Sequence, residues 1–261
     1  MSSLRVLLRG GITSYRALFG WLSPWLLIPM FAVGPLAQIL LFYFVGKSTG
    51  VNAPSFYLLG NAIQYAAIPC LFAMSLTIGD ERQQQTLGLI LISPARRLPL
   101  YIGRMLPVIL NGLIVAMFGL LAGSVLLQVR LRLDQLLPLL SVLAVSMFSC
   151  TGMGLAVGAI ALRVREATVL PNILFGVLLI LSGVNVERVS LPPWMIEAGD
   201  WLPLTHGIAA ARLVAAGDSA GSAAVQMAWE ALVGGMYATS GYLLLLWFER
   251  RSRREATLER Y

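Results

Sequence analysis

Few residues of this chain could carry out chemistry, and none within its apolar segments forms a known catalytic or nucleotide-binding pattern. A phosphate-binding loop requires G-x-x-x-x-G-K-[ST]; Gly46-Lys47-Ser48 comes nearest, but Leu41 stands where the first glycine is required. Within its apolar segments the sequence has no H-E-x-x-H, no G-x-S-x-G and no paired carboxylates, and His206 is its only histidine. We therefore expect a protein that is not an enzyme, with no catalytic residues, no metal site and no cofactor of its own.

The composition is typical of a helical membrane protein. Hydrophobic residues make up 58% of the chain and charged residues only 12%, with a mean hydropathy of +0.79. Soluble domains carry about 25% charged residues, so too few polar side chains remain here to cover a soluble core. The net charge of +7 comes mostly from arginines at the ends of apolar runs, which argues against nucleic-acid binding. Cys70 and Cys150 lie within apolar segments, so we expect packed thiols.

Six apolar segments are long enough to cross a bilayer, which takes about 20 helical residues. We expect a single all-α integral membrane domain over residues 1–261, with an amphipathic interfacial helix at 1–22. A segment between 185 and 222 contains Pro192, Pro193 and Pro203, which prevent a regular helix through its middle, and is expected to be partly re-entrant. The predicted crossings are 24–45, 56–79, 100–128, 136–162, 168–184 and 223–248.

The distribution of basic residues predicts the orientation. Fourteen of the 19 gather on one side of the predicted crossings, and positive side chains favour the cytoplasm. We therefore expect a multi-pass protein of the plasma (inner) membrane with both termini cytoplasmic, together with the insert at 80–97. Gly46-Lys47-Ser48 then falls in an external loop. The five basic residues on the external side are Lys47, Arg130, Arg132, Arg188 and Arg212.

The insert between the second and third crossings is first polar and then amphipathic. Asp80 is predicted to cap a short helix lying against the membrane, and Pro94 to end it. A soluble partner could press on such a helix; an ordinary surface connector is the alternative. The expected buried face consists of Leu87, Leu89, Ile90 and Leu91, and the expected polar contacts are Glu81, Arg82 and Thr86.

The residues of this insert resemble those of a known family. Glu81-Arg82, Thr86-Leu87, Leu91-Ile92-Ser93-Pro94 and Gly103-Arg104 resemble the coupling region of the permease subunits of type-2 ATP-binding-cassette transporters. Leu191-Pro192-Pro193-Trp194, Leu202-Pro203-Leu204-Thr205 and Arg212 resemble the same family's segment before its last crossing. The resemblance covers nearly the whole chain. Gln85 and Gly88 depart from it, standing where the family often has glycine and glutamate, and the second change removes a carboxylate that could pair with the partner.

The resemblance implies a half-transporter that has no ATPase domain of its own. Two permease chains, identical or different, would each set a coupling helix into a separate cytosolic ABC ATPase, which binds ATP and Mg. Export is the usual direction. The implied ATPase-coupling residues are Asp80, Glu81, Arg82, Thr86, Leu87, Leu89, Ile90, Leu91 and Pro94.

Polar residues within the crossings are candidates for the substrate path. We select Asn61, Gln64 and Asn111, whose segments flank the insert, and add Glu230; the alternative for the amides is hydrogen bonding between helices. The alternative for Glu230 is pairing with Arg212 or reaching the interface. Gly154 and Gly158 form a G-x-x-x-G, which allows close helix approach within the chain or between chains.

The apolar crossings favour a hydrophobic or amphipathic cargo. A drug or antibiotic is the first choice, and a lipid or lipid-linked glycan is the second. An ion-coupled secondary transporter and a structural membrane protein are the hypotheses from other classes. The scarcity of ionisable residues within the crossings argues against the ion-coupled carrier.

Overall fold

The computed structural model describes residues 25, 29–50, 53–83, 97–162 and 167–255, and within them the chain is helical without strands. Five described stretches are long and apolar enough to cross a membrane, namely Phe31–Ser48, Pro54–Gly79, Arg97–Leu126, Leu133–Ala161 and Ala220–Arg251. The all-α, multi-pass character predicted from composition is confirmed. The elements are η1 (Pro29–Val33), α3 (Gly34–Thr49), α4 (Pro54–Ile68), η2 (Pro69–Ala73), α5 (Met74–Gln83), α7 (Arg97–Leu126), α8 (Leu133–Ala161), α9 (Val169–Leu181), η3 (Arg188–Ser190), α10 (Pro193–Asp200), α11 (Thr205–Ala216) and α12 (Ala220–Glu255).

The fifth predicted crossing corresponds to a short helix. α9 has 13 residues, which at 1.5 Å per residue gives about 20 Å, whereas the hydrocarbon core is about 30 Å thick. Residues 163–166 precede it and lie outside the described part of the chain. A sixth complete crossing therefore stays a prediction.

Two helix ends differ from the sequence predictions. The loop predicted at Gly46-Lys47-Ser48 is wrong, because these residues form the last turn of α3, which ends at the left-handed Gly50; their external location stays a prediction. The predicted helix cap at Asp80 is also wrong, because α5 continues unbroken through Asp80 to Gln83. No proline interrupts residues 74–83, so nothing in the sequence forces the helix to end before Asp80.

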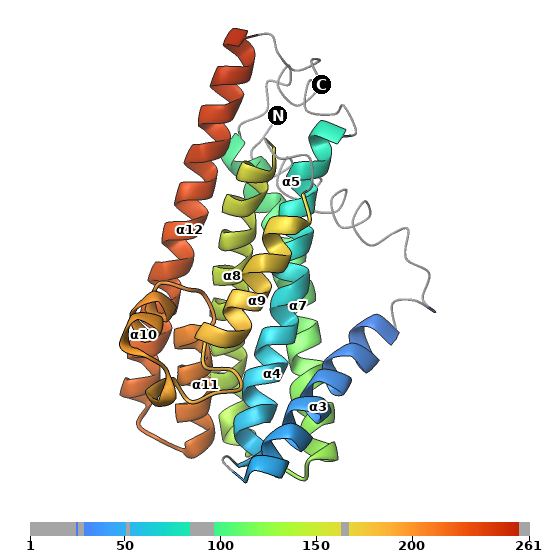
Figure 1. Cartoon of the computed structure of the whole chain (residues 1–261), viewed down its shortest axis with the longest axis vertical. Helices are drawn as coiled ribbons and strands as arrows, with labels where there is room; N and C mark the ends of the chain where they lie inside the picture. Colours follow the sequence, from blue (N-terminus) through green and yellow to red (C-terminus); the bar gives the residue numbers. More distant parts are fainter. Residues whose placement is uncertain (1–24, 26–28, 51–52, 84–96, 163–166, 256–261) are drawn as a thin grey trace.

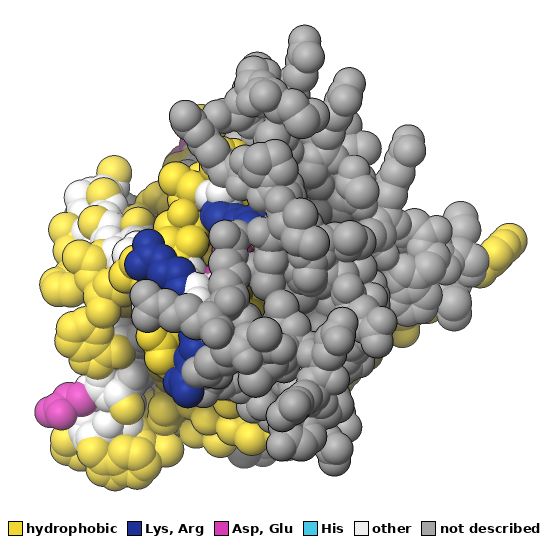
Figure 2. Space-filling view, turned by 90° about the horizontal axis from the view of Figure 1, so that it is seen from above, with side chains coloured by type: hydrophobic (Ala, Val, Ile, Leu, Met, Phe, Trp, Pro, Cys, Tyr) yellow, Lys and Arg dark blue, Asp and Glu magenta, His cyan; other side chains and the backbone are white. Residues whose placement is uncertain are grey.

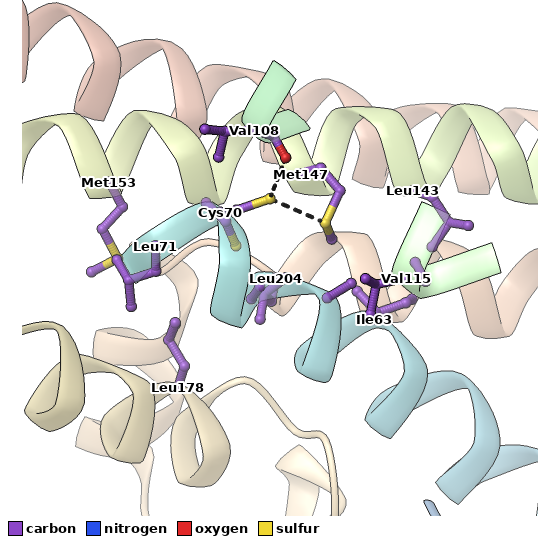
Figure 3. Packing of buried hydrophobic residues seen from close by; sticks show 14 of the residues in the cluster. Ile63, Cys70, Leu71, Val108, Val115, Leu143, Met147, Met153, Leu178 and Leu204 are labelled. Atoms are coloured by element: carbon purple, nitrogen blue, oxygen red, sulfur yellow. Dashed lines mark hydrogen bonds between the residues drawn. The ribbon is translucent and has the colours of Figure 1, made fainter. Parts of the chain in front are cut away.

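The centre of the bundle is α8, which packs along α12 and against α5, α7 and α11. The G-x-x-x-G is used within the chain: a Cβ on Gly154 would lie 2.8 Å from the carbonyl oxygen of Cys70, and one on Gly158 would lie 3.1 Å from Ser75. Cys70 and Cys150 are buried free thiols, as predicted. In Figure 3 the Cys70 sulfur contacts Met147 on α8 and the carbonyl of Val108 on α7, at 3.6 and 3.7 Å.

The bundle has two distinct ends (Figure 1). α5 and α12 end, and α7 begins, at the upper end of the figure; the α3–α4, α7–α8 and α11–α12 turns lie at the lower end. The short helices α10 and α11 lie beside the lower half of α12. The described basic residues of the two predicted sides accordingly separate to opposite ends. The predicted interfacial helix at 1–22 lies outside the described residues.

Candidate functional site

A cluster of side-chain amides joins α3, α4 and the turn after α9. The Nε2 of Gln38 donates to Asn61 Oδ1 at 3.1 Å and to Gln64 Oε1 at 3.3 Å. Asn61 Nδ2 donates to Asn185 Oδ1 at 2.8 Å and to its own helix at the carbonyl of Tyr57. Asn61 and Gln64 are fully buried. The Nε2 of Gln64 and the Nδ2 of Asn185 are buried donors without an acceptor among the described residues, which is costly in an apolar bundle and marks a place where another polar group could bind.

A glycine allows the turn after α9 to reach α4. A Cβ on Gly60 would lie 2.5 Å from the carbonyl oxygen of Val184, so any larger residue would push the turn away. Arg212 of α11 donates to that same carbonyl at 3.0 Å, and its guanidinium lies 3.6 Å from the ring centroid of Phe56. Burial lowers the pKa of Arg212 to about 10, against the opposing effect of the Glu187 charge, and the side chain remains a cation at neutral pH. These contacts tie the segment between α9 and α12 to α4 beside the amide cluster.

Asn111 lies apart from this cluster. It is on α7, where the adjacent Gly112 faces the sulfur of Cys70, and its buried Nδ2 has no acceptor among the described residues. Of the four candidate path residues, the structure brings together Asn61 and Gln64 only.

Glu230 holds the start of α11. It is fully buried on α12, where Oε1 accepts the N–H of Leu204 at 2.8 Å and Oε2 accepts the N–H of Gly207 at 3.0 Å. A carboxylate here satisfies backbone donors that a helix N-terminus leaves unpaired and complements its dipole. The predicted ion pair of Glu230 with Arg212 is wrong, because both carboxylate oxygens accept backbone N–H groups instead. The alternative, a position at the interface, stays a prediction. The segment between α9 and α12 folds back against α12, where the carboxylate accepts the free N–H groups at the start of α11.

At the opposite end of the bundle, a second carboxylate links α12 to α7. Glu249, near the end of α12, forms an ion pair with Arg97 at 3.0 Å and accepts the hydroxyl of Tyr101 at 3.1 Å, both at the start of α7. Asp80, Glu81 and Arg82 lie in the last turn of α5 at this same end. Figure 2, viewed onto this end, shows Lys and Arg side chains gathered over the described helices.

A comparison with protein families decides the class of this membrane bundle. The family model for the ABC-2 type transporter matches residues 15–215, which are 201 of the 261 residues. The chain belongs to the ABC-2 type transporter family. A search of the curated proteins found no match to the chain.

Membership of the ABC-2 family gives the coarse function. Such chains are membrane subunits of ATP-binding-cassette transporters, so this ABC-2 chain is a multi-pass transport subunit, and its family associates with ABC ATPases. The match includes the whole insert. Thr86, Leu87, Leu89, Ile90, Leu91 and Pro94 lie outside the described residues, and the coupling roles remain predictions for them and for Asp80, Glu81 and Arg82 alike.

Three residues of this ABC-2 bundle were not selected from the sequence as site residues. Gln38 was visible as a polar residue within an apolar run, but nothing in the sequence placed it beside Asn61. Asn185 directly follows the fifth apolar segment, where it reads as an ordinary loop residue. Glu249 precedes Arg250 and Arg251 and is typical of a solvated helix end, although only 8% of it is exposed.

Proposed function

We propose that this chain is the permease subunit of an ATP-driven exporter of hydrophobic or amphipathic drug-like molecules. The observation that carries the proposal is the ABC-2 family match, which runs through five predicted crossings and the insert between the second and third. The sequence contains no P-loop, so ATP and Mg would be bound by a separate ATPase chain. Two permease chains and two ATPase subunits would form the working transporter.

A cavity beside the segment between α9 and α12 supports an amphipathic cargo. It has a volume of about 490 Å³ and lies between α10, α11 and α12. Drug-sized ligands occupy cavities of roughly 300–1,000 Å³ lined mainly by apolar and aromatic side chains with a few polar groups. The lining residues are Glu197, Asp200, Trp201, His206, Trp229 and Val233.

The coupling role is tested by replacing Glu81 and Arg82 together with alanine. We expect export to fall about tenfold or more, because hydrogen bonds to charged groups contribute roughly 1.5–3 kcal/mol each and both contacts to the ATPase would be lost. Transport into inverted vesicles containing the partner ATPase measures the effect, together with stimulation of ATP hydrolysis.

The matched control is Arg250→Ala, which removes an exposed charge from α12 at the same end of the bundle as Glu81 and Arg82. It should leave transport unchanged. Unchanged export by the Glu81→Ala/Arg82→Ala variant would reject the coupling role, and uphill transport by the permease alone on a proton or sodium gradient would reject the ATP-driven class.

The orientation is tested by cysteine labelling. Ser48 is exposed at the end of α3, and Arg250 is exposed near the end of α12 at the opposite end of the bundle. A membrane-impermeant maleimide added to intact cells should label Ser48→Cys and not Arg250→Cys. Because Cys70 and Cys150 are buried, the unmodified chain supplies the background. The reverse labelling pattern would invert the predicted topology.

A further inference from the structure

A second cavity at the end of the bundle that carries the α3–α4 and α7–α8 turns is lined by two arginines. Its volume is about 410 Å³. Arg130 comes from the α7–α8 connection and Arg212 from α11, while Ser55 and Phe56 belong to the first turn of α4. α4 begins without a side-chain cap, so its first turn adds partial positive charge to this wall.

The two arginines differ in their ion pairing from their neighbours on this end. Arg132 pairs with Asp134 at 2.8 Å, and Arg188 pairs with Asp200 at 2.6 Å. Neither Arg130 nor Arg212 forms an ion pair within the described part of the chain, although Glu187 exerts an electrostatic effect on Arg212.

Arg212 is the more buried of the two arginines. It is held by the backbone carbonyls of Val184 and Phe56, and its Nε is buried without an acceptor among the described residues. A partly buried cation of this kind is stabilised by an anion nearby, and a guanidinium offers phosphate a planar set of donors.

The rest of the wall is apolar. Such a cavity suits a molecule that carries an anionic group beside a hydrocarbon portion, and it lies where the helices turn, at the level expected for headgroups. The apolar lining consists of Phe56, Leu59, Val129, Leu131, Ala215 and Ala216.

We propose that this cavity binds the phosphate group of an anionic amphiphile, with Arg130 and Arg212 as its cationic partners. The phosphate could come from the headgroup of a bilayer lipid or from free phosphate in solution. The inference concerns binding alone and does not depend on the transport function or on the identity of the cargo.

The test uses the full chain in nanodiscs of phosphatidylcholine with a minor fraction of phosphatidylglycerol. Native mass spectrometry counts the phosphatidylglycerol molecules retained per chain. We expect Arg130→Gln to reduce retention about fivefold, as for the loss of one basic contact to an anionic lipid. Arg130 is exposed, so this substitution should leave the fold intact.

The matched control is Arg132→Gln, which removes the same charge two residues away from an arginine that is already paired with Asp134. Its retention should equal that of the unmodified chain. Equal retention in the Arg130 and Arg132 variants, or no preference for phosphatidylglycerol over phosphatidylcholine, would overturn the proposal.

A further arm distinguishes the two sources of phosphate. Excess inorganic phosphate that displaces phosphatidylglycerol from the unmodified chain, but not the residual lipid on Arg130→Gln, would show that the phosphate group alone is recognised. Retention that resists inorganic phosphate, with the same dependence on Arg130, would identify the lipid as the ligand.

Discussion

Replacing Gly234 with valine is expected to separate α12 from α8 and prevent the bundle from packing. A Cβ on Gly234 would lie 2.7 Å from the Cα of Ser149, and one on Gly152 of the facing helix would lie 2.7 Å from the carbonyl oxygen of Gly234. The obstructing atoms are backbone, so no change of rotamer relieves the contact. We expect the free energy of unfolding to fall by about 3 kcal/mol or more, which is the upper end of the usual cost of inserting extra atoms into a packed core.

The neighbouring glycine provides the control for this substitution. The control variant is Gly235→Val. A Cβ on Gly235 would meet nothing within 4 Å, and the change in helix propensity is the same as for Gly234→Val. Size-exclusion profiles and thermal unfolding in detergent should show a lowered midpoint, or loss of the folded peak, for Gly234→Val only. Equal behaviour of the two variants would mean that α8 and α12 do not meet closely at this position.

Replacing Glu230 with alanine is expected to release the start of α11. The change leaves the buried N–H groups of Leu204 and Gly207 without acceptors, at about 1–3 kcal/mol each. Leu204 also has a left-handed backbone with φ of 74°, which is costly for a bulky residue and is held in place partly by this hydrogen bond. A loss of about 3 kcal/mol would lower the midpoint of thermal unfolding by roughly 6–12 °C.

Tryptophan fluorescence measures this change locally, because Trp201 and Trp229 lie near the same helix start. The control is Glu197→Ala, which removes an exposed carboxylate from α10. An unfolding midpoint for Glu230→Ala within a degree or so of the control would show that the carboxylate is dispensable for the fold, leaving substrate contact as its role.

The helices were predictable where apolar length alone determines them. The α7, α8 and α12 spans agree with the predictions to within a few residues at most ends, because a bilayer-crossing helix requires a long apolar run. Short elements were less predictable. Pro192, Pro193 and Pro203 were expected to prevent a regular helix through the middle of residues 185–222, and the segment is divided there into α10 and α11. The two short helices themselves were not predicted; Pro193 occupies the first turn of α10, where a missing N–H costs nothing.

The candidate site was predictable in residue type and less so in arrangement. Asn61 and Gln64 stood out as amides within an apolar run, but their partners Gln38 and Asn185 lie 23 or more residues away in the chain. Glu230 was visible as an intramembrane carboxylate, whereas its role depends on α11 folding back toward α12. Pairings of this kind are set by packing between helices, which a single sequence does not specify.

The π-helical turn η2 has a consequence for the side of the bundle on which the last turn of α5 lies. A π-helical turn contains about one residue more than the α-helical turn it replaces, and one residue corresponds to about 100° of rotation about the axis. The continuous helix from α4 through η2 to α5 can therefore pack against α3 and α7 along α4, and against α8 along α5. Deleting one residue between Pro69 and Ala73 would rotate Asp80–Gln83 about the helix axis by more than a quarter of a turn. These residues would then lie toward a different side of the bundle.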